Sequence, residues 1–387
     1  MKQLMRKVVM ATIFTMPGLS MAANDMQQMQ KEVDTLKRQN KVILQRLEAS
    51  MDMMEKRGKN GSSKTSIGGY GEMHYNNLSN NKVGGDAKKE IDLHRFILFV
   101  GHEFSPDIRF WSELEVEHTK TDKDGGEVAI EQAYLEFDLT DSLLARTGVM
   151  LVPVGIINET HEPPTFYGVE RNNVEKNIIP TTWREGGVSL NGRNSGFSYD
   201  LAVHSGLQTS AADNYAVRKG REAVREAPAD DPAYTARVKW TGIAGLELAA
   251  SVQQQTDITQ GTDITAGAAT LVEAHLVWQT GPFALRTLYA SWSLDGEGPR
   301  AVGADEQTGW YVEPSFRLSP KLGVFARHSS WDNRVNSGSD TETTQTDIGF
   351  NYWPHEDVVL KADYQTQEAP QGKDEYEGFN LGVGYQF

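Results

Sequence analysis

The segment "EYEGFNLGVGYQF" (375–387) closes the chain and alternates between apolar residues and small or polar ones. From Phe379 onward, Phe379, Leu381, Tyr385 and Phe387 fall on one side of an extended strand, whereas the other side carries only Asn, Gly and Gln. The last residues of a soluble protein usually fray in water. An apolar stripe that reaches the final residue therefore requires an apolar environment that covers it.

The same alternation recurs along the preceding sequence. In "DIRFWSELEVEH" (107–118), Leu114 and Val116 share one face and Glu113 and Glu115 take the other, which is the pattern of a strand between an apolar and a polar environment. The run at 282–293 is ambiguous, because either of its faces could be the apolar one. About sixteen such runs are found, near 67–77, 90–104, 107–119, 127–139, 143–152, 184–192, 196–206, 233–241, 245–256, 268–279, 282–293, 308–318, 321–332, 343–353, 357–367 and 376–387.

The connections between these runs alternate in length. Eight long, polar connections alternate with short ones, as outer-membrane barrels do with their outer loops and periplasmic turns. Lipid offers the backbone no hydrogen-bond partners, so strands span a bilayer only in a closed sheet, and sixteen strands leave an aqueous channel inside. A soluble β-sandwich is the alternative. The seven short turns lie at 105–106, 140–142, 191–196, 241–245, 280–282, 319–321 and 354–357.

The first 22 residues have the features of a secretory signal peptide. Lys2, Arg6 and Lys7 precede a short apolar core (8–16), and "SMA" (20–22) offers small residues for cleavage near Ala22. A buried N-terminal helix is the alternative. Without this leader, 35 of the 38 basic side chains remain against 53 acidic ones, a formal charge of −18. Such an acidic chain is not expected to bind nucleic acid.

Residues 23–57 have helical periodicity, with apolar residues at alternating spacings of three and four. We interpret them as a periplasmic coiled coil that forms a homo-oligomer, in which one polar Asn fixes the register. A lone amphipathic helix packed on a domain is the alternative. A Gly- and Ser-rich linker (58–66) follows, before the barrel (67–387). The residues expected to contact between helices are Met26, Met29, Val33, Leu36, Asn40, Ile43 and Leu47.

One connection of some thirty residues (153–183) is too long to lack a role. We expect it to fold into the barrel as a constriction loop, and an outer lid is the alternative. Its "ETHEP" segment has no second His at helical spacing, and Pro163 and Pro164 prevent a helix, so no metal is expected. No catalytic motif is recognisable, and neither an enzyme nor a cofactor is predicted. The candidate pore residues are Glu159, His161, Glu162, Glu170, Arg171, Glu175, Lys176 and Arg184.

Charged side chains on the predicted inner faces are distributed unevenly. The early strands carry mostly acids and the later strands mostly bases, so we expect an acidic arc to face a basic arc across the channel. The alternative is that these charged side chains are simply on faces in contact with water and produce no ordered field. The early set is Arg95, Arg109, Glu113, Glu115, Glu117, Glu131, Glu136 and Arg146, and the later set is Arg237, Lys239, Arg317, Arg327 and Lys361.

Three stretches resemble the phosphate-selective porin O/P family of Gram-negative bacteria. They are "DLHRFILFVGHEFSPDIRFWSELEVEH" (92–118), the segment from "VAIEQAYLEF" to "TTWREGG" (128–187) and the closing "GVGYQF" (382–387). The resemblance implies a trimeric sixteen-stranded outer-membrane porin. It also implies that Phe387 is a signal for the barrel-assembly machinery, and that lipid and lipopolysaccharide surround the barrel.

Anion-selective members of this family use a ladder of inward Arg and a Lys cluster, which cannot be placed here. Phosphate binding by Arg171, Lys176 or Arg184 is a hypothesis drawn from the resemblance alone. The sequence thus predicts an all-β transmembrane barrel behind a short α-helical coiled coil. It would be a passive channel for small polar or charged solutes, such as phosphate or carboxylates. An adhesive or structural barrel, or a barrel enzyme with a closed lumen, is the alternative.

Overall fold

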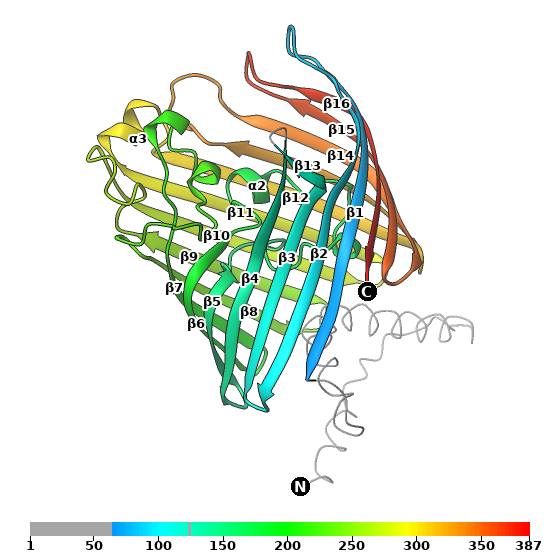
Figure 1. Ribbon diagram of the computed structural model, residues 1–387. Helices are drawn as coiled ribbons and strands as arrows, with labels where there is room; N and C mark the ends of the chain where they lie inside the picture. The colour runs from blue at the N-terminus through cyan, green and yellow to red at the C-terminus, as the bar shows by residue number, and fades with distance from the viewer. Residues whose placement is uncertain (1–63, 123–124) are drawn as a thin grey trace, which may run out of the picture.

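The computed structural model describes residues 64–122 and 125–387, and these form one closed antiparallel barrel (Figure 1). The strands follow one another around the ring in chain order, and β16 pairs with β1. The predicted sixteen-stranded barrel is confirmed. The strands are β1 Thr65–Asn80, β2 Lys88–Ser105, β3 Ile108–Asp122, β4 Gly125–Thr140, β5 Leu143–Leu151, β6 Arg184–Asn194, β7 Phe197–His204, β8 Ala233–Ile243, β9 Leu246–Gln255, β10 Ala266–Thr280, β11 Phe283–Gly296, β12 Glu306–Ser319, β13 Leu322–Asp332, β14 Thr343–His355, β15 Val358–Glu368 and β16 Tyr376–Gln386.

The predicted leader, the coiled coil and most of the linker lie within residues 1–63, outside the described residues. They stay predictions. None of the helices in the described part of the chain is long and apolar enough to cross a membrane. These helices are single turns within the loops, namely η1 Pro163–Thr165, α2 Val174–Asn177, η2 Ala211–Asp213, η3 Val217–Gly220 and α3 Glu297–Ala301.

The seven short turns occur where they are predicted, at one end of the barrel. The first residues of β1 and the last of β16 lie at this same end. Thr65 pairs with His102, just before the β2–β3 turn, and Gln386 donates its backbone N–H to Asp357 of the β14–β15 turn, at 2.9 Å. One predicted long connection is wrong. Only residues 123–124 separate β3 from β4, because both strands extend beyond the predicted runs 107–119 and 127–139.

The two faces of each strand meet different surroundings. On β16, Leu381 is 46% exposed on the outside, whereas its neighbour Asn380 is 1% exposed inside. Asn380 accordingly finds polar partners across the inner face, where its amide donates to Asp363 at 2.8 Å and to Gln365 at 3.0 Å. On the outer face, Phe379 and Phe387 are exposed beside Leu381, and hydrocarbon requires apolar side chains there.

The ends of the sheet close by backbone pairing that reaches the last residue. The N–H of Gly69 donates to the carbonyl of Phe387 at 3.0 Å, and the N–H of Phe387 donates back to Gly69 at 2.9 Å. The ring of Phe387 stacks on Phe96 of β2, with centroids 6.4 Å apart. The apolar stripe of the opening segment therefore lies on the outer surface of the seam that closes the barrel.

Part of the interior is apolar, which the alternation alone did not predict. On β11, Leu288, Ala290 and Trp292 point inward and are buried, while Tyr289 is 49% exposed on the outside. Both faces of this strand are apolar because one faces outward and the other packs beneath two loops. These inner residues form a core with residues of the 152–183 and 205–232 loops, including Ile178. This explains the ambiguity of the run at 282–293.

Replacing Leu381 with Arg should destabilise the barrel in a lipid bilayer, because a guanidinium in hydrocarbon costs about 2–4 kcal/mol near the midplane. The measurement is the free energy of unfolding in guanidinium chloride, followed by tryptophan fluorescence in lipid vesicles. Gln371→Arg is the control, since Gln371 is exposed on the β15–β16 loop. Equal losses for both variants would contradict the assignment of the outer face.

Candidate functional site

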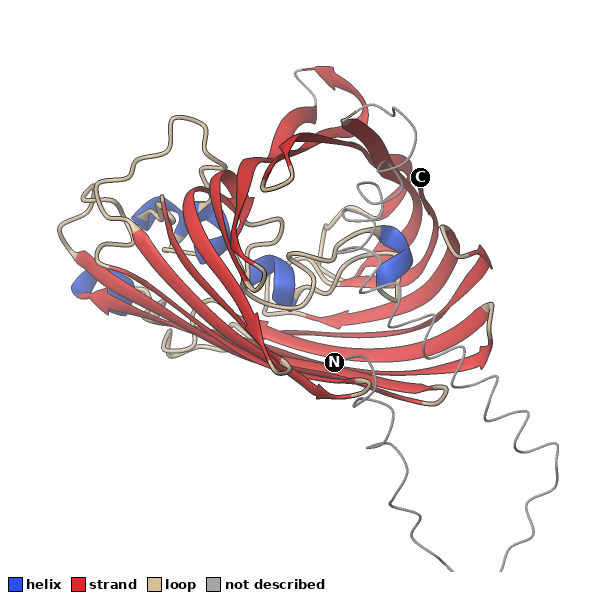
Figure 2. Ribbon diagram, turned by 90° about the horizontal axis from the view of Figure 1, so that it is seen from below, coloured by secondary structure: helices blue, strands red, loops and turns tan. Residues whose placement is uncertain are grey.

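The long connection between β5 and β6, residues 152–183, runs through the barrel and is called the inward loop here (Figure 2). On one side, His161 lies against β3 and β4, 3.6 Å from Glu113. On the other side, Trp292 of β11 donates from its indole to the carbonyl of Ile178 at 2.9 Å. Strands β3 and β11 lie on opposite sides of the closed ring, so the inward loop crosses the lumen.

A buried carboxylate organises the inward loop. Glu175 is fully buried and accepts the backbone N–H groups of Ile156 at 2.9 Å and Ile157 at 2.6 Å. The hydroxyl of Tyr311 on β12 donates to the same carboxylate at 3.0 Å. Burial raises the pKa of Glu175, and these hydrogen bonds oppose that rise. Glu175 therefore fixes the loop to itself and to the wall, and does not face the passage as predicted.

The two ends of the inward loop are tied by one amide. Asn158 is fully buried, and its side chain donates to the carbonyls of Val152 at 2.8 Å and Trp183 at 3.0 Å. Its amide oxygen accepts the backbone N–H of Trp183 at 2.7 Å. The loop thus leaves and re-enters the wall at one point with its backbone groups paired, as burial requires.

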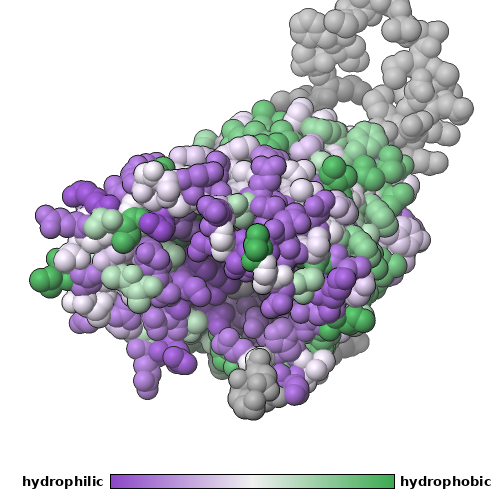
Figure 3. Space-filling model, turned by 90° about the horizontal axis from the view of Figure 1, so that it is seen from above, coloured by the Kyte–Doolittle hydropathy of each residue, from purple (hydrophilic) through white to green (hydrophobic). Residues whose placement is uncertain are grey.

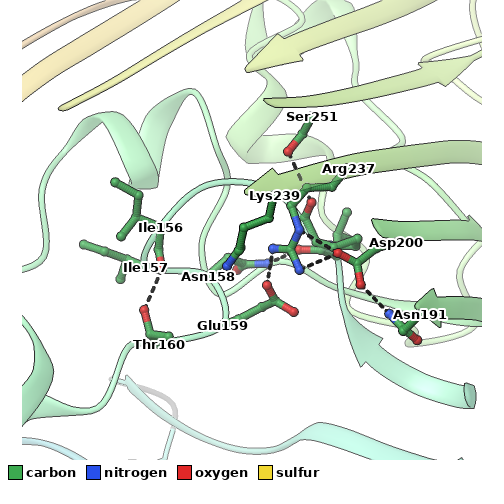
Figure 4. A network of polar contacts seen from close by, with 12 residues as sticks. Ile156, Ile157, Asn158, Glu159, Thr160, Asn191, Asp200, Arg237, Lys239 and Ser251 are labelled. Atoms are coloured by element: carbon green, nitrogen blue, oxygen red, sulfur yellow. Dashed lines mark hydrogen bonds and ion pairs between the residues drawn. The ribbon is translucent and has the colours of Figure 1, made fainter. Parts of the chain in front are cut away.

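Glu159 and the predicted lumen residue Arg237 form an ion pair (Figure 4). The guanidinium also holds Asp200 of β7, whose other oxygen accepts from Asn191 at 2.6 Å. Burial opposes ionisation of Glu159, but Arg237 and then Lys239 outweigh it and lower its pKa. Arg237 is therefore neutralised by two carboxylates.

Two cations of the predicted basic arc on the later strands lie beside carboxylates. Arg327 lies 3.0 Å from Asp347 and 3.4 Å from Glu313, and all three are buried. Lys239 lies 3.4 Å from Glu247. Each carboxylate lies on the same strand as its cation or on an adjoining one. The alternation of residues assigns these carboxylates to the inner face, but it does not show which cation each of them pairs with. These cations and anions therefore cancel locally.

Two further cations of this arc lie over aromatic rings. The ammonium of Lys361 is 3.5 Å from the ring centroid of Phe166 in the inward loop. The guanidinium of Arg317 is 3.5 Å from the ring centroid of Trp353. Such contacts stabilise a cation without neutralising it, and here the first of them holds the inward loop against β15.

The early strands carry the predicted acids on the inner face, together with cations that pair with them. Arg95 bridges Glu72 at 2.8 Å and Glu115 at 3.5 Å. Glu136 accepts from Arg109 at 3.0 Å and from Arg146 at 2.8 Å. Glu113, Glu115, Glu131 and Glu136 are all buried.

The remaining candidates of the inward loop have separate places. Glu170 reaches back to β1, where it lies 3.2 Å from His74. The carbonyl of Glu162 accepts the N–H of Thr165 in the turn η1, at 3.0 Å. Lys176 is exposed at the end of α2. Arg171 and Arg184 come together in one cavity, which the predicted lumen residue Arg95 also lines.

Arg171 and Arg184 line a cavity of about 620 Å³ between the inward loop and β2–β4. Figure 3 shows the end of the molecule with the long loops as a mainly hydrophilic surface around a hollow. The cavity has charges of both signs. Its basic residues are Arg95, Arg171, Arg184, Arg218, Arg221 and Arg225, and its acidic residues are Glu115, Glu117, Glu127, Glu131 and Glu222.

Three of these arginines were missed in the sequence. They belong to the 205–232 loop, which folds against the inward loop. Arg218 donates to the carbonyl of Thr181, and Arg221 donates to that of Thr182 at 2.9 Å. The signal available was the basic run "YAVRKGREAVRE" (215–226), but nothing local indicates that a long polar loop turns inward.

The arginines crowd one another. Burial, followed by the charges of Arg221 and Arg171, lowers the pKa of Arg218 to about 9. Burial and the charge of Arg184 lower the pKa of Arg221 to about 10. Both stay charged at neutral pH, and their hydrogen-bond partners named above are carbonyl groups, which leave the charge uncancelled. The cavity therefore contains two guanidinium groups whose hydrogen-bond partners are carbonyls, together with carboxylates of β3 and β4.

The sequence profile of the family described as phosphate-selective porin O and P matches residues 66–385. An uncharacterized protein of Aquifex aeolicus (strain VF5) is 32% identical over 349 residues, which cover 80% of this chain and 77% of that protein.

Three solved structures share the fold. The anion-selective porin from Comamonas acidovorans is 12% identical, with a TM-score of 0.60 over 84% of this chain and 100% of that one. The outer membrane channel DcaP of Acinetobacter baumannii is 15% identical, with a TM-score of 0.59 over 84% and 97%. OmpT of Vibrio cholerae, in a trimer form, is 13% identical, with a TM-score of 0.55 over 84% and 99%. The profile match spans the whole barrel, and the chain therefore belongs to the phosphate-selective porin O and P family of outer-membrane porins.

Proposed function

We propose that this porin conducts small anions, such as phosphate and carboxylates, past the arginine side of the cavity. The observation that carries the proposal is that Arg218 and Arg221 are held by carbonyl oxygens rather than by carboxylates. Most other inward arginines, such as Arg237 and Arg327, are neutralised. A guanidinium offers a planar fork of donors that matches carboxylate and phosphate oxygens.

The acidic side of the cavity complements this role. Glu115 and Glu117 line the same cavity as the arginines, and we infer that the two kinds of charge produce a field across the passage. Charged and dipolar solutes gain energy by orienting in such a field, whereas apolar solutes gain nothing. The transverse field proposed from the sequence is retained, but its basic side comes from two loops instead of the later strands. The channel is passive and needs no cofactor.

We propose that the inward loop is the constriction. Its contacts with β3, β11 and β12 support this role, because a segment tied to opposite walls occupies part of the cross-section. The buried Glu175 and Asn158 keep it from swinging out of the lumen. Solutes would pass beside it and along the arginine-lined cavity.

We further propose a homotrimer with the N-terminal coiled coil (23–57) in the periplasm, below the short turns. The trimer form of the Vibrio cholerae protein supports the oligomeric state. An apolar groove of about 630 Å³ on the barrel surface, lined by residues such as Leu190, Leu201 and Val252, offers a surface for a neighbouring subunit or lipid. Phe387 would be recognised by the barrel-assembly machinery.

Replacing Arg218 and Arg221 with Gln should reduce anion selectivity. Each charge about 4 Å from a bound anion is worth about 1 kcal/mol even at the dielectric constant of water, or about fivefold in occupancy. The measurement is the reversal potential in a planar bilayer with a gradient of potassium chloride, repeated with potassium phosphate. We expect the reversal potential to shift toward the equilibrium potential of potassium.

The matched control for this pair is Arg300→Gln with Lys373→Gln, two exposed cations on other long loops. An equal shift in the control would attribute selectivity to overall charge and contradict the arginine site. A native protein that inserts into the bilayer and conducts no current would favour the closed-lumen alternative.

Deleting Thr165–Gly168 from the inward loop should raise the single-channel conductance, because a shorter loop leaves more of the cross-section to water. The measurement is the unit conductance in potassium chloride. Deletion of Asn336–Ser339 from the β13–β14 loop removes the same number of residues and should leave the conductance unchanged. An unchanged conductance in the first deletion would mean that solutes pass elsewhere.

A further inference from the structure

Three buried side chains from β3, β4 and the inward loop converge on one point. The Nε2 atom of His161 lies 3.6 Å from Oε1 of Glu113 and 3.5 Å from Oε2 of Glu131. None of these residues is more than 3% exposed, and each of the three converging atoms lacks a hydrogen-bond partner. Unpaired polar atoms in a buried site are costly, so the arrangement indicates a missing ligand.

The orientation of His161 fits a metal ligand. Its Nδ1 atom lies 3.0 Å from the carbonyl oxygen of Asn158. A carbonyl can only accept, so Nδ1 carries the proton, and the neutral imidazole then has its lone pair on Nε2. Metal-binding histidines are typically held in this way, with the distal nitrogen donating to a carbonyl or carboxylate.

The carboxylates are also supported from behind. The second oxygen of Glu113 accepts from the side-chain amide of Gln132 at 2.6 Å. The second oxygen of Glu131 faces the guanidinium of Arg184 at 3.8 Å. Each carboxylate thus has one oxygen next to a polar group and the other directed at His161.

The separations distinguish a metal site from a direct ion pair. A charge-assisted hydrogen bond spans about 2.7–2.9 Å. Tetrahedral zinc with bonds of about 2.0–2.2 Å to nitrogen and oxygen separates its ligand atoms by roughly 3.3–3.6 Å. The observed 3.5 and 3.6 Å match the second case. We propose that Glu113, Glu131 and His161 bind a divalent transition metal ion of the zinc class, which fastens the inward loop to β3 and β4.

A fourth coordination position remains for water. The hydroxyl of Tyr70 is buried without a hydrogen-bond partner, and its ring packs edge-on against His161 with centroids 6.1 Å apart. This hydroxyl is the candidate partner of the water. The ion enters from the 620 Å³ cavity, because Glu131 lines that cavity as well.

A second histidine in the same barrel provides the contrast. His275 also lies between two carboxylates, but its nitrogens are 2.6 Å from Glu273 and 3.3 Å from Glu247, within hydrogen-bonding distance. A proton on each nitrogen satisfies that arrangement without a metal. The sequence predicted no metal because "ETHEP" supplies only one of the three ligands, and the other two come from separate strands.

The competing occupant of the site is a proton. A proton and a metal ion exclude each other at Nε2 of His161, because a histidine binds a metal through a deprotonated nitrogen.

The test uses the full-length protein purified in detergent and stripped of metal with EDTA. Zn²⁺ binding is measured by isothermal titration calorimetry, and Co²⁺ binding by its visible absorption, which is intense in tetrahedral sites. We expect one ion per chain. Glu131→Gln and His161→Gln should each weaken binding of the ion by more than about 100-fold. This exceeds the effect that is usual for residues that hydrogen-bond to a metal ligand without binding the metal themselves. His275→Gln is the control and should bind as the native protein does.

Heat-modifiable migration on gels checks that each variant is a folded barrel, and Glu113→Gln serves as a third variant if another fails to fold. Absence of Zn²⁺ and Co²⁺ binding by the folded native protein would overturn the proposal and leave a protonated imidazole as the bridge. Binding that survives in all three variants would also overturn it. The result does not depend on conductance, so the anion proposal can fail without affecting it.

Discussion

The structure depends on the pairing of its first and last strands. Lipid provides no hydrogen-bond partner, so a sheet in a bilayer is stable only when its two edges meet. The mutual bonds of Gly69 and Phe387 complete this closure at the last residue of the chain. Everything inside follows from it, because a closed sheet of sixteen strands encloses more space than the wall side chains fill. The inward loop and the 205–232 loop occupy part of that space.

The charges inside the barrel divide into two kinds. Most are paired along the wall, as Arg95 is with Glu72 and Arg327 with Asp347, and these pairs hold side chains in place at little net charge. Arg218 and Arg221 of the 205–232 loop are different, because carbonyl oxygens position them without cancelling their charge. This difference in partner, rather than the number of charges, separates the structural residues from those proposed to contact solutes. The formal charge of the chain is therefore a poor guide to its selectivity.

The strands of the wall could be predicted from the sequence, whereas the contacts inside the lumen could not. Alternation has a period of two, so strands such as β3 and β16 could be recognised, and their faces assigned, from local sequence alone. The partners inside are non-local. Glu175 was expected in the passage but binds Tyr311, far away in the chain. Arg218 was not considered, because a polar loop that folds inward has the same composition as one in solvent. The core around Trp292 appeared only as an ambiguous run, since a strand covered on both sides has no polar face.

The crossing of the inward loop also has a mechanical consequence. Where the lumen is empty, a wide cylinder resists lateral compression only through its wall. A segment anchored to β3, β11 and β12 acts as a strut across the diameter. It would keep the cross-section from flattening under bilayer pressure. The same element would then set both the bore of the pore and the roundness of the cylinder, so weakening its anchors would deform the outline of the protein as well as the passage within it.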